Sequence, residues 1–140
     1  MADDSEDDRL LMRLAFRDYP RLNIVGEVNS GEQVLAYLLG IGTFQDRRLN
    51  PFPDLLLLDL HMPQFDGFEV LAWLQTHSFP GLRVVVLSGS LIPKEIAKTI
   101  ELGADDYHIK SPSREHRLNI ARGLDQLMGE CVEKPSHPAL

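Results

Sequence analysis

The chain has 140 residues, a length typical of one domain with a single hydrophobic core. It carries 14 basic and 21 acidic side chains, a formal net charge of −7. This balance argues against nucleic acid as a partner, because phosphate binding needs a basic face. The lone cysteine, Cys131, excludes an internal disulfide framework and fits a cytoplasmic location, and no apolar run is long enough to cross a membrane.

The first third of the chain predicts two helices, a strand and a loop. Five acidic residues stand among the first eight positions, which is typical of a helix start or, alternatively, of a divalent cation site. Ser5 and Asp8 have the spacing of a capping box, so a helix is predicted to begin there. Residues 23–28 (NIVGEV) predict a short strand and residues 30–39 a helix. Residues 40–53, with several Gly and Pro, predict an unusually long loop.

The central stretch LLLLDLHMP, residues 55–63, runs four leucines into Asp59. A uniform apolar run is typical of a strand covered on both faces, as in a parallel sheet flanked by helices. The rest of the chain is predicted to alternate: a helix at 68–77, a strand at 82–90, a helix from Pro93 to Gly103, a strand at 105–110 and a helix at 113–130. This alternation predicts βαβ crossovers, a parallel sheet and helices on both of its faces.

Polar side chains stand where the predicted strands end. They are the acid pair Asp3 and Asp4 before the first helix, Asp59, Ser88 and Lys110. Because parallel strands end at the same edge of a sheet, these side chains are expected to converge. Clustered carboxylates suit Mg²⁺, and an aspartate beside such an ion is a candidate nucleophile toward phosphorus. Taken singly, each residue also has a plainer interpretation: Asp59 as a turn cap, Ser88 as a loop cap and Lys110 as a surface lysine.

Together these residues resemble the receiver domains of two-component response regulators. The matching pieces are the acid pair DD at 3–4, LLLLDLHMPQFDG around Asp59, VVVLSGS with Ser88 and GADDYHIK with Lys110. The resemblance spans Asp3 to about Met128. It implies a flavodoxin-like, doubly wound α/β fold with strand order 2-1-3-4-5. We expect the receiver domain at residues 1–129 and a polar tail at 130–140.

The resemblance also implies a chemistry for the site. Asp59 would accept a phosphoryl group from a sensor histidine kinase, and Lys110 would pair with that group. Mg²⁺ would be held directly by Asp4, by Asp59 and by the backbone carbonyl of His61, with Asp3 acting through water. The His61 side chain itself is expected to be solvated.

Ser88 and Tyr107 are the expected switch residues. In the family the aromatic ring moves inward once the hydroxyl is drawn to the phosphate, which shifts the population toward an active form. The output would be contact with a downstream protein through the fourth helix, fifth strand and fifth helix, so the chain is not expected to be an enzyme. Tyr107 could instead be an ordinary core aromatic with a wet hydroxyl.

Three departures from the family pattern stand out. Only Met1 and Ala2 precede the acid pair, where the family has a whole central strand; either residues precede Met1, another segment fills the slot, or the isolated domain is unstable, and we favour the first. Ser111 follows Lys110 where the family has proline, which puts a cis bond there in doubt. The long loop at 40–53, with KS after the last strand, weakly resembles stand-alone regulators of bacterial phytochrome-type kinases; a homodimer stays open.

Two alternatives to a phosphorylated switch remain. One is a pseudo-receiver that binds partners without phosphorylation. The other is a haloacid-dehalogenase-like phosphatase, which also uses a strand-end aspartate and magnesium. Such enzymes have a second acid two residues past the nucleophile, where this chain has His61, and they tend to need more chain for a substrate cap.

Overall fold

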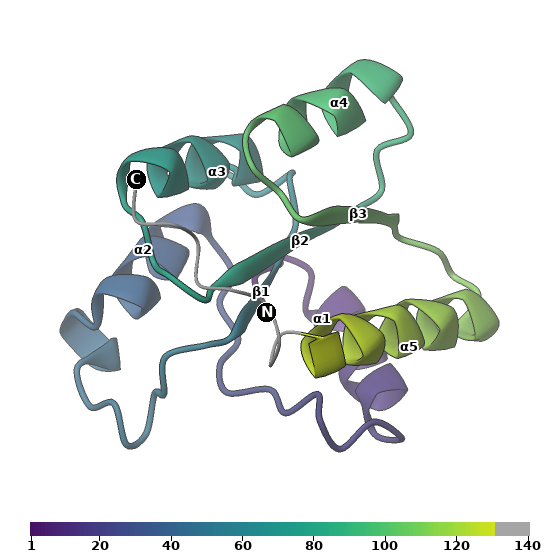
Figure 1. The fold of residues 1–140 in the computed structure, drawn as a ribbon, viewed down its shortest axis with the longest axis horizontal. Coiled ribbons are helices and arrows are strands. Elements are labelled where there is room, and N and C mark those ends of the chain that lie inside the picture. The colour runs from purple at the N-terminus through teal and green to yellow at the C-terminus, as the bar shows by residue number, and fades with distance from the viewer. Residues whose placement is uncertain (131–140) are drawn as a thin grey trace.

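The computed structural model describes residues 1–130, and its chain alternates between helices and strands (Figure 1). The elements are α1 (Glu6–Phe16), α2 (Gly31–Leu39), the short 3₁₀ helix η1 (Gly42–Phe44), β1 (Leu55–Leu58), α3 (Gly67–Thr76), β2 (Arg83–Ser88), α4 (Pro93–Glu101), β3 (Asp106–Ile109) and α5 (Arg114–Glu130). Except for Glu130, the tail expected at residues 130–140 lies outside the described residues, and so does Cys131.

The strands β1, β2 and β3 form a parallel sheet in that order. Because successive strand residues face opposite sides, Leu56 and Leu58 pack toward α2 and α3, whereas Leu57 packs toward α1 and α5. The helices therefore cover both faces, with α1 and α5 side by side on one of them (Figure 1). This arrangement confirms the predicted α/β fold class.

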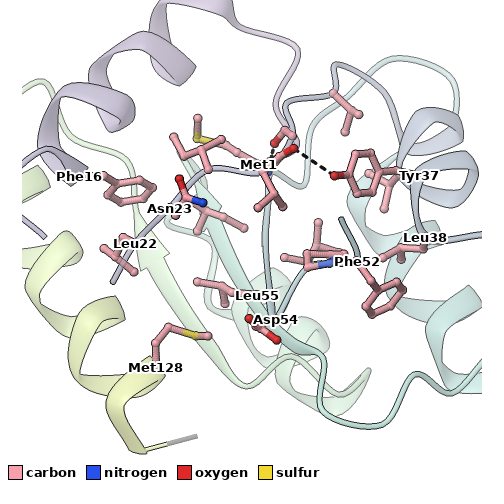
Figure 2. Close-up of a pocket in the computed structure, with 18 of the residues that line it drawn as sticks. Met1, Phe16, Leu22, Asn23, Tyr37, Leu38, Phe52, Asp54, Leu55 and Met128 are labelled. Atoms are coloured by element: carbon pink, nitrogen blue, oxygen red, sulfur yellow. Dashed lines mark hydrogen bonds between the residues drawn. The ribbon is translucent and has the colours of Figure 1, made fainter. Parts of the chain in front are cut away.

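The central slot of the sheet holds only the first residues of the chain. Ala2 forms parallel bridges to Val28 on one side and to Leu58 on the other. The Ala2 amide donates to the Leu57 carbonyl at 2.8 Å, and the Asp59 amide donates to the Ala2 carbonyl at 2.9 Å. A cavity of about 140 Å³ lies beside Met1, between residues 23–26 and residues 53–57 (Figure 2).

The predicted strand at residues 23–28 forms only at Val28, and the rest of that segment has no regular structure. The physical reason is the short neighbour: a strand needs a partner along its length, and Met1–Asp3 reaches only Val28 and the Gly26 carbonyl. The sheet in residues 1–130 therefore has three regular strands, not five. The order 2-1-3-4-5 is visible only as Ala2 lying between Val28 and β1.

Of the two hydrogen bonds of the capping box predicted at α1, one forms and the other does not. The Asp8 amide donates to the Ser5 side chain at 3.2 Å, as predicted, but the Ser5 amide donates to Asp3 instead. A complete capping box stands at α3, where Asp66 and Glu69 exchange side-chain and backbone bonds.

Two further properties concern the whole described part of the chain. Residues 1–130 contain no cis peptide bond, so the bond before Ser111 is trans. No helix within them is both long and apolar enough to span a bilayer.

Candidate functional site

Asp59 is placed at the site by the strand that precedes it. The leucines of β1 are covered on both faces, so the next residue emerges at the carboxyl edge of the sheet with 5% of its surface exposed. The start of α3 packs closely against the backbone of Asp59 and Leu60. A Cβ atom added to Gly67 would overlap the Asp59 carbonyl oxygen and come within 2.7 Å of the Leu60 Cα atom. Gly67 thus lets α3 approach the backbone that carries Asp59.

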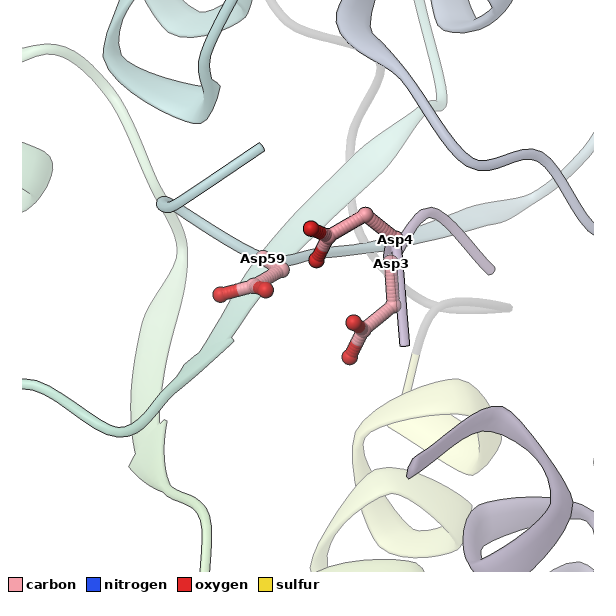
Figure 3. Close-up of side chains that lie close together, drawn as sticks. All are labelled: Asp3, Asp4 and Asp59. Carbon is pink, nitrogen blue, oxygen red and sulfur yellow. The ribbon is translucent and has the colours of Figure 1, made fainter. Parts of the chain in front are cut away.

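Three carboxylates gather at this edge, from Asp3, Asp4 and Asp59 (Figure 3). One oxygen from each lies within 4.8 Å of the others. Asp3 and Asp59 are buried, whereas Asp4 is exposed. The set fits a hard divalent cation, because such ions take oxygen ligands and Mg²⁺ commonly binds one or two carboxylates and keeps several waters.

Lys110 follows β3 and reaches into the same cluster. Its Nζ atom lies 2.7 Å from an Asp3 oxygen, 2.9 Å from an Asp8 oxygen and 3.1 Å from an Asp59 oxygen. Only 21% of the Lys110 side chain is exposed. The ammonium therefore compensates two buried carboxylates that otherwise face each other.

Burial and charge shift two titrations at the site. Burial raises the pKa of Asp59; Lys110 opposes this shift and Asp3 adds to it, and the net result is a raised pKa. Burial lowers the pKa of Lys110, but its hydrogen bonds to Asp3 and Asp8 and its attraction to Asp59 outweigh burial and raise that pKa. Lys110 is thus a stable cation, and the raised pKa of the neighbouring Asp59 favours the protonated form of its carboxyl group.

Ser88 and Tyr107 lie on neighbouring strands. Ser88 ends β2, is fully buried, and its side-chain oxygen accepts a hydrogen bond from the Ser90 amide at 3.3 Å. The Tyr107 hydroxyl donates to the Ser90 backbone carbonyl at 2.8 Å. Both predicted switch residues therefore contact the same loop between β2 and α4, through Ser90.

His61 lies on the loop after Asp59. Its amide donates to an Asp59 side-chain oxygen at 3.4 Å, and its ring Nε2 lies 3.2 Å from a Glu95 oxygen on α4. The ring is 60% exposed, in line with the solvated side chain that we expected. Metal binding by its backbone carbonyl stays a prediction.

Two contacts at the site were not predicted from the sequence. Asp8 was interpreted as part of a helix start or, alternatively, of a divalent cation site, yet its carboxylate binds Lys110. Glu95 carried no prediction, yet it pairs with His61 and accepts a hydrogen bond from the Ser90 hydroxyl. Neither contact had a signal in the sequence, because each joins residues that lie far apart in the chain.

The family model of the response regulator receiver domain matches residues 1–137. The chain belongs to the receiver domain family. Receiver domains are generally signalling modules of two-component systems that partner with sensor histidine kinases and bind Mg²⁺ at an acidic pocket. In this receiver domain the acidic pocket corresponds to the cluster of Asp3, Asp4 and Asp59.

Curated relatives include the nitrate/nitrite response regulator NarL of Escherichia coli K12, 32% identical over 116 residues, which are 80% of this chain and 49% of NarL. The response regulator VraR of Staphylococcus aureus is 27% identical over 92% of this chain and 57% of VraR. This receiver domain thus spans about half the length of these relatives.

Solved structures of similar proteins extend over most of both chains. The phosphorylated cyanobacterial phytochrome response regulator RcpA has a TM-score of 0.79 and 29% identity, covering 97% of this chain and 94% of RcpA. RPA3017, a response regulator in red light signalling of R. palustris, has a TM-score of 0.76 and 30% identity, covering 88% and 87%. Stand-alone, phytochrome-associated regulators are therefore among its structural neighbours, as the sequence resemblance indicated.

Proposed function

We propose that this receiver domain is a phosphorylation-dependent signalling switch that accepts a phosphoryl group on Asp59 from a sensor histidine kinase. The observation that carries the proposal is the contact between the Lys110 ammonium and the Asp59 carboxylate, 3.1 Å apart at a largely buried strand end. A carboxylate with a fixed cation at its side has the charge balance needed to receive an anionic group.

The transfer forms one bond and breaks one bond. An Asp59 side-chain oxygen attacks the phosphorus of a phosphohistidine, the O–P bond forms, and the P–N bond breaks with its electron pair returning to the imidazole nitrogen. Lys110 then moves its ion pair from the carboxylate to an oxygen of the new acyl phosphate. The Ser88 hydroxyl hydrogen-bonds another of those oxygens.

Magnesium fits the oxygen atoms at this edge. Asp4, Asp59 and the His61 backbone carbonyl would hold it directly, and Asp3 would act through water, because the Asp3 carboxylate already binds Lys110 and the Ser5 amide. When bound, the ion supplies positive charge to the phosphoryl oxygens. One related response regulator, Rcp1, has been solved in a Mn²⁺-bound form, at 26% identity and a TM-score of 0.69, covering 89% of this chain.

The switch would run from Ser88 to Tyr107 through the loop that both contact. Drawing the Ser88 hydroxyl toward the phosphoryl group breaks its bond to the Ser90 amide, which lets the loop and the Tyr107 ring move together. The changed face is formed by α4, β3 and α5. We propose that a downstream protein binds this face, and the similarity to RcpA and RPA3017 supports a phytochrome-type kinase as the phosphoryl donor.

The test is phosphorylation by a small donor, followed by intact mass measurement. The protein is incubated with Mg²⁺ and acetyl phosphate or phosphoramidate, beside Asp59→Asn. A labile adduct of one phosphoryl group on the wild type alone is the expected result. Lys110→Ala should slow its formation at least tenfold, whereas Lys98→Ala, on the exposed side of α4, should leave the rate unchanged.

Other outcomes would favour the other two classes of function. No adduct under any condition would favour a pseudo-receiver that binds partners without phosphorylation. Rapid turnover of many phosphoesters would favour a phosphatase. The position two residues past Asp59 holds His61, whose ring pairs with Glu95, and not a second acid, which argues against the phosphatase.

A further inference from the structure

Glu95 lies in the first turn of α4 and contacts both of the loops that carry the candidate site. One of its carboxylate oxygens, Oε2, accepts a hydrogen bond from the Ser90 hydroxyl at 3.2 Å. The other, Oε1, lies 3.2 Å from the Nε2 atom of the His61 ring. Ser90 follows Ser88 on the loop after β2, and His61 follows Asp59 on the loop after β1. A single side chain, 23% exposed, therefore ties α4 to the two loops.

Ser90 belongs to the connection already proposed between Ser88 and Tyr107. Its amide donates to the Ser88 side-chain oxygen, and its backbone carbonyl accepts from the Tyr107 hydroxyl. Its hydroxyl oxygen also accepts at 3.3 Å from the amide of Ile92, the residue that precedes α4 and whose own apolar side chain cannot cap the helix. The bond from Ser90 to Glu95 is thus one of several that hold this loop.

His61 offers Glu95 a different connection. The His61 amide donates to an Asp59 side-chain oxygen at 3.4 Å, and the His61 backbone carbonyl is one of the proposed Mg²⁺ ligands. Within residues 1–130 the ring has no hydrogen-bond or ion-pair partner other than Glu95. A displacement of the His61 loop therefore reaches α4 through Glu95 and involves neither Ser88 nor Tyr107.

The contact between these two side chains is incompletely satisfied. The Glu95 Oε1 atom is out of reach of solvent and accepts no hydrogen bond within residues 1–130. The His61 ring is thus close enough for an ion pair but is not aligned for a hydrogen bond. A buried acceptor without a donor is unfavourable. A small turn of the ring toward Oε1 would complete the hydrogen bond and fasten the start of α4.

We infer that Glu95 is a positioning residue that couples the His61 loop to the first turn of α4, as a second connection beside the one through Ser90. The inference rests on the proposed function, because it takes the His61 backbone as part of the phosphoryl site. Engagement of the His61 carbonyl brings the ring onto Glu95 Oε1, and the completed bond holds the first turn of α4 more firmly. Because such coupling is reciprocal, a turn held in this way favours binding at the carbonyl by the same factor.

The test uses Mg²⁺ alone as the probe, at constant pH and without a phosphoryl donor. Calorimetry gives the Kd of Mg²⁺, and NMR follows hydrogen exchange of the Ile96 amide, which donates to the Ile92 carbonyl at 3.1 Å in the first turn of α4. We expect saturating Mg²⁺ to slow exchange of this amide about threefold or more in the wild type. The same slowing is expected in Ser88→Ala, which interrupts the other connection.

Two variants should lose the response. Glu95→Ala removes the side chain that carries the coupling, and His61→Ala removes the ring while keeping the backbone carbonyl and the bond from Ser90 to Glu95. In both variants Mg²⁺ should leave exchange at Ile96 unchanged and should bind about threefold more weakly. Glu101→Ala, which removes an equal charge from the exposed last residue of the same helix, should keep both values of the wild type.

Unchanged exchange at Ile96 in the wild type, at Mg²⁺ concentrations where calorimetry shows binding, would overturn the inference and leave the proposed function standing. A response kept in His61→Ala but lost in Glu95→Ala would overturn it too, because Glu95 would then act on α4 through Ser90 alone. Loss of the response in Ser88→Ala would also overturn it, since α4 would then have a single connection to the site. Absence of Mg²⁺ binding would refute the proposed metal site, and this coupling with it.

Discussion

The carboxylate of Asp8 lies 2.9 Å from the ammonium of Lys110, although 102 positions separate the two residues. Asp8 comes from the first turn of α1 and Lys110 from the end of β3. The same ammonium also contacts Asp3 and Asp59. One cation thus joins the first helix to the carboxylates at the edge of the sheet.

Replacing Asp8 by Asn should weaken the protein only slightly. The Asp8 side chain is 39% exposed, so solvent screens its attraction to Lys110, and Lys110 keeps two buried partners. We expect the free energy of unfolding to fall by about 0.5 kcal/mol, as measured by urea denaturation. Asp7→Asn is the matched control on the same turn and should have no effect. Equal effects of both variants would mean that the Asp8–Lys110 contact contributes nothing.

Asp59 should make the protein less stable as pH rises. Its raised pKa means that the folded protein keeps the Asp59 proton to a higher pH than the unfolded chain, where the ordinary value is 3.8. The free energy of unfolding therefore falls above about pH 4, until Asp59 is ionised in both states. Asp59→Asn removes this loss, so its Tm should exceed that of the wild type at pH 7 and match it at pH 3.

Two controls accompany the Tm measurement on Asp59→Asn: the addition of Mg²⁺ and the substitution Asp46→Asn. Mg²⁺ should raise the Tm of the wild type at pH 7 more than that of Asp59→Asn. Hydrogen bonds from Arg48 lower the pKa of the exposed Asp46, so Asp46→Asn should not raise Tm at pH 7. A Tm for Asp59→Asn below that of the wild type at neutral pH would show that burial does not dominate at Asp59.

The amino terminus predicts a pH dependence of the opposite sign. Burial lowers the pKa of the Met1 amino group from 8.0 to about 6, with Glu27 opposing the shift and Arg9 adding to it. As pH falls from 8 to 6 the unfolded chain takes up this proton first, so the free energy of unfolding falls by roughly 2 kcal/mol. Acetylation of Met1 should abolish this loss while keeping an N–H donor for Gly26.

The measurement for Met1 is urea unfolding at pH 6 and pH 8 of acetylated and free chains whose intact mass shows that Met1 is retained. The quantity to compare is the loss of unfolding free energy from pH 8 to pH 6 in the free chain minus the loss in the acetylated chain. Other groups that titrate in this range contribute equally to both chains, so their effects cancel in the difference. Parallel losses of stability in both chains would contradict the assignment to Met1.

Gly67→Ala should damage the site through the backbone. A methyl group there would overlap the Asp59 carbonyl, and backbone cannot give way as a flexible side chain does. We expect a loss of roughly 2–3 kcal/mol in the free energy of unfolding and slower phosphorylation. Gly123→Ala, where the nearest atom is 4.0 Å away on His108, should instead stabilise α5 by about 0.5–1 kcal/mol. A stable, fully active Gly67→Ala protein would refute this interpretation.

The convergence of Asp3, Asp59 and Lys110 could be anticipated from sequence because topology enforces it. A parallel sheet brings all strand ends to one edge, so a run of leucines that ends in Asp59 is enough to place that side chain. The Asp8 contact could not be anticipated, since a side chain one turn into a helix can bond to its own cap or to a distant partner. That choice depends on where β3 ends.

The strand predicted at residues 23–28 shows what the sequence alone could not establish. The composition of residues 23–28 predicted a strand, but local patterns cannot say whether a partner lies along its whole length. NIVGEV has the composition of a strand and yet forms one only at Val28, because a strand is defined by its partner.

The burial and charge of Lys110 also make it the least reactive lysine in the part of the chain that the structure describes. Acylating reagents attack the neutral amine, and the raised pKa of Lys110 keeps that form scarce, whereas Lys94 and Lys98 are exposed on α4. Mass spectrometry after brief treatment with an acetylating reagent should therefore find Lys110 labelled last. The order of labelling would therefore report whether the site is intact, in an assay that uses neither a kinase nor a ligand.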